Sequence, residues 1–276
     1  MSTQQTAGAG SGSAKATLYL IPTPLDFGCG EDSLNPIEQT IPLGTLQIAA
    51  RIDYWITENA KSTRAFLKRV DAYSPLRQPL QALNIQELPR ILHKHGDFGS
   101  QNAVLTEVDH LLQPALSGHC MALVSEAGLP AVADPGALVV RAAHRLGIGV
   151  SVLSGPSALL MALASSGLNG QSFAFVGYLP QDQTDRKKKI RELETLSTQT
   201  GQTQLFIETP YRNPALMESL LTTLKPNTRL SVACGLGVML DDCANGLQTY
   251  GTTVAQWKHA VNRLDWRLPC VFMLGR

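Results

Sequence analysis

The loop from Ser125 to Gly136 constrains the fold of this chain most. It directly follows an apolar run and carries two carboxylates, two glycines and two prolines. Further along, Val150–Ala158 repeats the plan, with a β-branched strand, a Gly-Pro break and an Ala/Leu-rich helix. In an open α/β sheet, ligands bind beyond the carboxyl ends of strands, where helix N-termini and backbone N–H groups converge. The two loops therefore predict that two strand ends of one sheet meet in the functional site.

The first half of the chain alternates short apolar strands with helical stretches. Short connections from strand to helix to strand imply right-handed parallel crossovers, so we expect a parallel sheet wrapped by helices. The polar stretch from Tyr73 to Pro89 is interpreted as a loop. The predicted strands are Thr17–Ile21, Ile52–Thr57, Met121–Ser125 and the segment from Val150, and the predicted helices are 44–51, 61–70 and 101–116.

A helix after the third strand has clear end signals. Asp134 can cap it, Pro135 fits its first position, and Gly147 stands at its C-terminal stop. The next helix opens at Pro156 and closes at Gly167, before a candidate domain seam at 168–170.

The second half has fewer helices per strand, which favours a mixed sheet with its helices on one side. We expect a tail over 1–14, an N-terminal α/β domain over 15–169 and a C-terminal α/β domain over 170–276. The predicted elements of the C-terminal domain are strands at 173–178, 203–208, 229–234 and 269–274, a basic helix from Asp185 to Leu196, and a helix capped by Asn213.

Composition narrows the class of protein. The chain has 276 residues, 44% of them hydrophobic and 16% charged, which is typical of a soluble globular protein with a sizeable core. No apolar run reaches membrane-spanning length, and the first residues lack the features of a secretion signal, so we expect a cytoplasmic protein.

The five cysteines form no Cys-x-x-Cys pair, which predicts reduced thiols and no thiolate zinc site. A net charge of +1 means that any contact with nucleic acid needs a local basic patch.

Six motifs in order resemble those of the tetrapyrrole (corrin/porphyrin) methylase superfamily, and most closely its branch that methylates a ribose 2′-hydroxyl of small-subunit ribosomal RNA. The resemblance runs from about Thr17 to the C-terminus. The six segments are Leu20–Pro24, Ser125–Pro130, Ala133–Gly136, Ser154–Ala158, Gly177–Pro180 and Glu208–Arg212.

This resemblance implies a two-domain α/β methyltransferase, usually a homodimer, that holds S-adenosylmethionine in the cleft between its domains. RNA or the small ribosomal subunit would be its partner. The backbone N–H groups of Gly128 and of the Pro156–Ala158 turn are candidates to hold the methionine carboxylate of the cofactor. The implied cofactor-binding residues are Pro24, Ser125, Glu126, Ala127, Gly128, Asp134, Ser154, Pro156, Ser157, Ala158, Glu208, Thr209 and Leu236.

Methyl transfer from a sulfonium is an in-line displacement, so the protein has to bind, align and exclude water, without a metal. If the acceptor is a hydroxyl, a base must take its proton, and Asp26, Glu126 and Glu208 are the candidate catalytic carboxylates. The candidate RNA-binding residues are Arg186, Lys187, Lys188, Lys189 and Arg212.

The chain departs from the ribosomal branch on the acceptor side. Asp26-Phe27 stands where that branch has Gly-Asn, 56–60 replaces an Ala-Glu-Asp-Thr-Arg segment, Glu126 and Leu129 replace aspartate and threonine, and 233–236 replaces Arg-Glu-Leu-Thr. Two alternatives therefore stay open: methylation of a tetrapyrrole or other small molecule, and a homologue that binds S-adenosylmethionine or RNA without catalysis.

Simpler structural roles are also open for several residues. Asp134 and Ser157 can act only as helix caps, Glu208 can form a loop salt bridge, and the basic run can be a solvated helix face. Met161 is expected in a helix core. His93 and His95 have no third ligand nearby in sequence, so no metal site is predicted.

Overall fold

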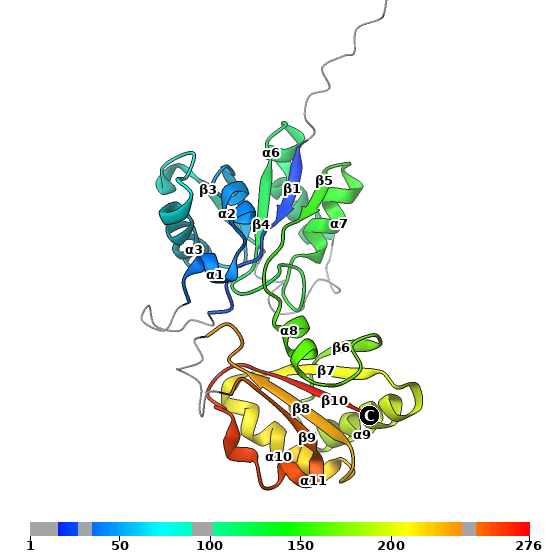
Figure 1. Cartoon of the computed structure of the whole chain (residues 1–276). Helices are drawn as coiled ribbons and strands as arrows, with labels where there is room; N and C mark the ends of the chain where they lie inside the picture. Colours follow the sequence, from blue (N-terminus) through cyan, green and yellow to red (C-terminus); the bar gives the residue numbers. More distant parts are fainter. Residues whose placement is uncertain (1–15, 27–34, 90–101, 239–246) are drawn as a thin grey trace, which may run out of the picture. The chain divides into compact units, whose positions relative to one another are not determined.

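The computed structural model describes residues 16–26, 35–89, 102–238 and 247–276 (Figure 1). They form two compact units. The first contains residues up to Pro22, Leu43–Glu126 and Pro130–Ser154, and the second contains Thr23–Pro42, Ala127–Leu129 and Gly155–Arg276. The seam predicted at 168–170 falls within the second unit, because the helix that precedes it packs against the second sheet. The predicted tail over 1–14 and the His93 and His95 pair lie outside the described residues.

The first unit is built on a parallel sheet, as predicted. Its strand order is β3-β2-β4-β1-β5, and every neighbouring pair is parallel. The strands are β1 (Thr17–Leu20), β2 (Tyr54–Thr57), β3 (Asn84–Glu87), β4 (Met121–Val124) and β5 (Gly149–Val152). The edge strand β3 lies in the stretch that we interpreted as a loop. Its side chains are largely exposed, so it lacks the apolar pattern of a buried strand.

Apolar side chains on both faces of this sheet are buried. Met121 and Leu123 of β4 pack with helices α5 and α7, while Ala122 and Val124, which alternate with them, are also buried. A strand that is buried on both faces needs layers above and below it, which accounts for the continuous apolar run. The helices of this unit are α2 (Leu43–Ala49), α3 (Ala60–Tyr73), α5 (Asn102–Leu111), α6 (Gln113–Leu116) and α7 (Ala137–Arg145).

Two helix predictions in this unit are corrected. The single helix predicted over 101–116 is α5 and α6, and Pro114 in the first turn of α6 cannot donate the N–H that a continuous helix requires. Helix α7 begins at Ala137 with Gly136 at its N-cap position and has no side-chain cap. Asp134 is therefore not the cap, and Pro135 is not the first helical residue.

The second unit is built on a mixed sheet, also as predicted. Its strand order is β6-β7-β10-β8-β9, in which β6 and β7 are parallel and the other pairs antiparallel. The strands are β6 (Phe173–Tyr178), β7 (Thr203–Glu208), β8 (Arg229–Cys234), β9 (Thr249–Thr253) and β10 (Cys270–Gly275). The edge strand β9, of sequence TYGTT, was not predicted.

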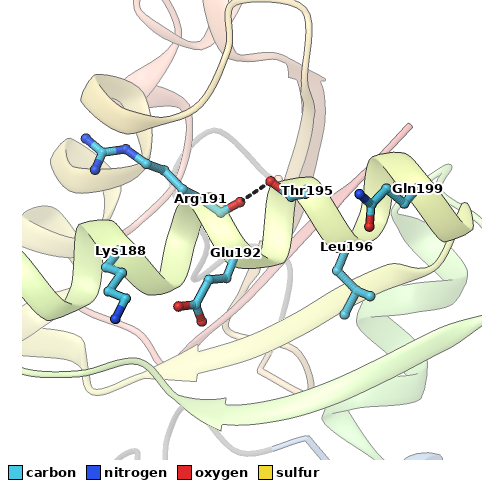
Figure 2. A pocket seen from close by; sticks show the side chains of 6 residues that line it. All are labelled: Lys188, Arg191, Glu192, Thr195, Leu196 and Gln199. Carbon is cyan, nitrogen blue, oxygen red and sulfur yellow. Dashed lines mark hydrogen bonds between the residues drawn. The ribbon is translucent and has the colours of Figure 1, made fainter.

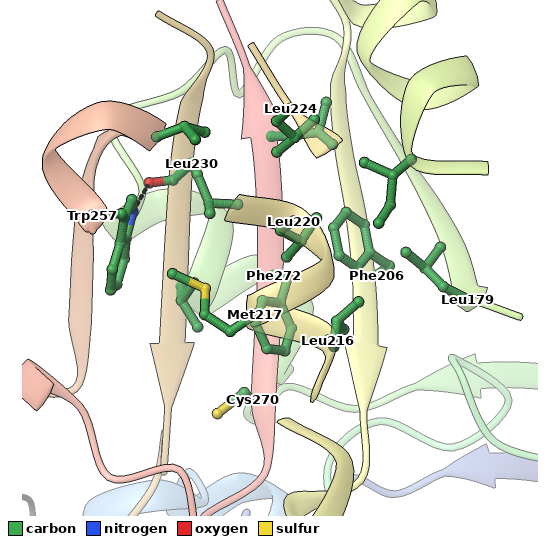
Figure 3. Close-up of a cluster of buried hydrophobic side chains, with 14 of the residues drawn as sticks. Leu179, Phe206, Leu216, Met217, Leu220, Leu224, Leu230, Trp257, Cys270 and Phe272 are labelled. Carbon is green, nitrogen blue, oxygen red and sulfur yellow. Dashed lines mark hydrogen bonds between the residues drawn. The ribbon is translucent and has the colours of Figure 1, made fainter. Parts of the chain in front are cut away.

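The two faces of the second sheet carry different helices. Phe206 and Phe272 lie on the face that packs with α9 and α10, where Trp257 donates from Nε1 to Leu230 O at 2.7 Å (Figure 3). Val271 and Met273 lie on the opposite face, against α8. The helices are α1 (Ile37–Thr40), α8 (Ala158–Ser165), α9 (Gln183–Thr200), α10 (Asn213–Thr223) and α11 (Val254–Trp257).

The pairing of β8 with β10 overturns the expectation that all thiols are reduced. Cys234 lies directly opposite Cys270 in the register, with 4.3 Å between their Cα atoms, and the two form a disulfide. Cys120 is a free, exposed thiol.

The predicted cap of helix α10 is also corrected. Asn213 is not the cap of this helix but its first residue, and its side-chain amide donates to Trp266 O and Leu268 O.

Candidate active site

Three carboxylates gather at the carboxyl ends of β2 and β4 in the first unit. Glu58 directly follows β2, Glu126 comes two residues after β4, and Asp134 lies further along the same loop. Asn59 Nδ2 donates to Glu126 Oε1 at 2.9 Å, and the Glu126 backbone N–H donates to Glu58 Oε2 at 3.4 Å. The structure thus adds Glu58 to the predicted residues Glu126 and Asp134. Its place after a buried parallel strand was the available sequence signal.

Asp134 has the most perturbed environment of the three. Burial, together with the charges of Glu58 and Glu126, raises the pKa of its carboxyl to about 7, while a hydrogen bond with Ser125 opposes the rise. The carboxyl therefore titrates near neutral pH. A carboxyl with such a pKa can take up or release a proton under physiological conditions, which is typical of functional sites.

In the second unit, residues 23–25 meet the loops predicted to hold the cofactor. Thr23 and Gly128 exchange two backbone hydrogen bonds of 2.9 and 3.0 Å, and Pro24 is buried beside them. A Cβ atom on Gly128 would lie 3.0 Å from Leu25 Cδ2 and 3.6 Å from Pro156 O. The predicted meeting of the two loops is therefore confirmed. The Gly128 N–H, however, donates to Thr23 O, so our expectation that it holds a carboxylate is wrong.

A pocket of about 370 Å³ lies next to this contact, entirely within the second unit. Pockets of such a size are typical of small-molecule sites. Its lining includes the predicted residue Pro156, and Leu25 and Gly237 adjoin the predicted residues Pro24 and Leu236. The lining residues are Leu25, Gln39, Thr40, Pro42, Gly155, Pro156, Met161 and Gly237.

Met161 corrects one prediction. Leu159 and Leu163 of α8 are buried, but Met161 is 40% exposed and lines the pocket. Helix α8 turns only part of its apolar surface to the sheet, and its high overall hydrophobicity hid this difference in the sequence. The side chain of Met161 is therefore accessible from the pocket.

The start of α8 carries the predicted residues Ser157 and Ala158. Ser157 is the N-cap residue, but its side chain makes no capping hydrogen bond, and the first intrahelical donor is Met161 N–H to Ser157 O. The N–H groups of the first turn, beginning at Ala158, therefore have no partner within the helix. Ser154 belongs to the first unit, where its carbonyl accepts a hydrogen bond from Thr45 Oγ1 at 2.9 Å.

Glu208 is held at the end of β7. Its Oε1 accepts hydrogen bonds from Thr209 N–H at 2.7 Å and Arg212 Nε at 2.9 Å, and its side chain is 3% exposed. Arg212 also forms an ion pair with Glu208, with 2.7 Å between Arg212 Nη2 and Glu208 Oε1. The salt-bridge alternative for Glu208 is therefore confirmed. Roles for Glu208 in catalysis or cofactor binding, and for Arg212 in RNA binding, stay predictions. The same holds for Asp26, which is half-buried, for Ala127 and for the buried Leu236.

The predicted basic run occupies the first half of α9. Arg186 donates to Ser219 Oγ and to Gln181 O, both at 3.0 Å, while Lys187 is half-buried. Lys188 lies in a shallow hollow of about 430 Å³ along the exposed side of the helix (Figure 2). Lys189 pairs with Glu192 at 3.4 Å. The hollow is lined by Lys188, Arg191, Glu192, Thr195, Leu196 and Gln199.

Neither a membrane-spanning helix nor a metal-binding cluster is found in the described part of the chain. There, no helix is both long and apolar enough to cross a membrane. The described ranges also hold no group of three or more His, Cys, Asp or Glu side chains placed to bind a metal.

Comparisons with known proteins identify the class of this chain. The profile of the tetrapyrrole (corrin/porphyrin) methylases matches residues 49–239. A ribosomal RNA small subunit methyltransferase I of Xylella fastidiosa is 32% identical over 88% of this chain and 77% of that protein. Its counterpart in Vibrio cholerae is 32% identical over 75% of this chain and 60% of that protein.

The fold has a counterpart among solved structures. The crystal structure of the native uroporphyrin III C-methyltransferase of Thermus thermophilus superimposes with a TM-score of 0.50, over 95% of this chain and 98% of that one, at 14% identity. The two units thus have the architecture of a two-domain methylase. This chain belongs to the tetrapyrrole methylase family, whose members transfer a methyl group from S-adenosylmethionine.

Proposed function

We propose that this chain transfers a methyl group from S-adenosylmethionine to RNA of the small ribosomal subunit, at a ribose 2′-hydroxyl. The names of its relatives at about 30% identity support this acceptor. The chain spans 77% of the Xylella relative but only 60% of the Vibrio one, so the proposal concerns the reaction of the part present here.

The pocket of the second unit is the observation that carries the proposal. Leu25, Pro42 and Pro156 provide apolar walls suited to a planar base, and Gln39 and Thr40 add hydrogen-bonding groups. Gly237 borders it with φ +93°, and a Cβ atom there would lie 2.6 Å from Leu25 Cβ. Only glycine therefore allows this close approach of the two segments. These features fit S-adenosylmethionine, and the start of α8 offers backbone N–H groups for its carboxylate.

Residues of this chain have three tasks in the reaction. S-adenosylmethionine supplies the electrophilic methyl group, so the protein has to hold it, exclude water and align the acceptor oxygen. The pocket residues take the first task. Among the carboxylates, Glu126 remains the candidate base for the hydroxyl proton, together with Asp26 and Glu208.

The partners follow from this reaction. A ribosomal substrate favours a cytoplasmic protein, and relatedness to the methylase family favours a homodimer. Methylation of a tetrapyrrole or other small molecule is the competing enzymatic function, and binding without catalysis is the competing non-enzymatic one.

Isothermal titration with S-adenosylmethionine and S-adenosylhomocysteine tests the cofactor site. We expect micromolar affinity, near −8 kcal/mol, for the wild type. Gly237→Ala should weaken binding at least tenfold, because the new methyl group displaces Leu25 from the pocket wall. Gly170→Ala is the matched control, since no atom lies within 4 Å of its Cβ position. Circular dichroism verifies that both variants are folded.

Two results contradict the proposed site. If neither ligand binds the wild type, the chain keeps only the fold of the family. If a folded Gly237→Ala variant binds as tightly as the Gly170→Ala control, the cofactor lies elsewhere.

A further inference from the structure

Two tyrosines of the second unit expose their rings at the same end of the sheet. Tyr178 is the last residue of β6 and is 56% exposed, whereas Tyr211 follows β7 in a short 3-10 helix and is 80% exposed. Strands β6 and β7 are parallel, and Tyr178 stands opposite Ile207 in their register. Both tyrosines therefore lie at the carboxyl ends of neighbouring strands.

Tyr211 in particular presents an accessible aromatic surface. An aromatic side chain gains much of its stabilising effect from burial, and Tyr211 is the most exposed of the large apolar side chains in the described ranges. Its surroundings are ordered, because the Arg212 guanidinium lies 5.5 Å from the ring centre and is itself held by Glu208. The ring is thus held next to a cation rather than packed in a core.

Basic side chains lie at this end of the sheet, next to Asp182 and Asp185 at the start of helix α9. Helix α9 begins at Gln183, shortly after Tyr178, and its first two turns carry the run Arg186–Lys189. Arg212, which is paired with Glu208, lies beside Tyr211. Flat aromatic surfaces flanked by cations are how proteins bind single-stranded nucleic acid, with bases stacking on the rings and phosphates meeting the charges.

We propose that Tyr178 and Tyr211 form a stacking platform for unpaired bases of the RNA substrate, with Tyr211 as its main contact. This platform rests on the proposed function and extends it, because it implies that the target lies in a single-stranded or locally opened segment.

The test compares RNA with and without bases. Fluorescence anisotropy measures binding of a short labelled single-stranded RNA and of an abasic ribose-phosphate oligomer of the same length. Tyr211→Ala should weaken RNA binding about fivefold to a hundredfold and leave the abasic oligomer unaffected, since stacking needs a base. Tyr211→Phe should bind like the wild type. Phe173→Ala is the matched control, because Phe173 is 43% exposed at the opposite end of β6.

The platform is refuted if Tyr211→Ala binds RNA like the Phe173→Ala control, or if it loses affinity for both oligomers equally. It is also refuted if Tyr211→Ala weakens S-adenosylmethionine binding instead. Methyl transfer by the wild type distinguishes failure of the platform from failure of the proposed function. If the wild type methylates RNA and Tyr211→Ala does so equally well, only the platform fails; if the wild type neither binds nor methylates RNA, the proposed function fails with it.

Discussion

At the scale of residues, Asp134 has the most distinctive chemistry. Its unfolded carboxyl titrates near 3.8 and its folded carboxyl near 7, so the folded state binds the proton more tightly. The stability that this proton contributes is complete below pH 3.8 and is lost as the pH rises to about 7. The cause is burial beside Glu58 and Glu126, with Ser125 as the opposing hydrogen-bond partner.

This predicts how substitution of Asp134 changes the pH dependence of stability. Asp134→Asn mimics the neutral form, so its free energy of unfolding relative to wild type should increase from about pH 4 to about pH 8, by up to about 4 kcal/mol. Urea denaturation of both proteins across this range measures the difference. Parallel curves for the two proteins would show that the folded carboxyl titrates normally.

The sequence singled out Asp134 as a candidate site residue but did not indicate the environment of its carboxyl. A loop carboxylate before an Ala/Leu-rich segment is a good cap candidate. Its pKa, in contrast, depends on burial and on the neighbours Glu58 and Ser125, which come from two different strand ends. Likewise, the Gly128 N–H is used by Thr23, a pairing between segments far apart in sequence. Local patterns predict which loops meet, but not which donors remain free within them.

At the scale of elements, strands with apolar or β-branched runs were predicted, whereas the edge strands β3 and β9 were not. Strands β6, β7 and β8 begin and end where their apolar or β-branched runs predict. The edge strand β3 carries mostly polar residues of low strand propensity. Thr and Tyr in the edge strand β9 favour a strand, but its residues show no apolar alternation that would identify it. The Cys234–Cys270 disulfide was also beyond local patterns, because it depends on the register of β8 against β10.

That disulfide leads to a prediction about stability. It links positions 36 residues apart, and a closed loop of such a length stabilises the folded state by about 3–4 kcal/mol. Reduction with dithiothreitol should lower the free energy of unfolding by this amount in wild type and in Cys120→Ser, which removes only the exposed thiol. Peptide mapping that recovers Cys234 and Cys270 as free, alkylated thiols from non-reduced protein would contradict this assignment.

At the scale of the whole molecule, the two-domain architecture and the parallel and mixed sheets follow from the order of strands and helices and from the family motifs. The boundary between the two units, which we predicted at 169/170, is more difficult to place from the sequence. Helix α8 follows the first sheet in sequence but packs on the second. Only the tertiary contacts of Leu159 and Leu163 assign that helix to its unit.

The most direct measurement is methyl transfer from tritium-labelled S-adenosylmethionine to small ribosomal subunits purified from cells that lack this protein. We predict label in the RNA, and after alkaline hydrolysis we predict it in a dinucleotide that resists cleavage, because a methylated 2′-oxygen cannot attack the neighbouring phosphate. Label in an alkali-sensitive mononucleotide would move the acceptor from the ribose to a base. No label in RNA, together with transfer to a tetrapyrrole, would contradict the proposed function.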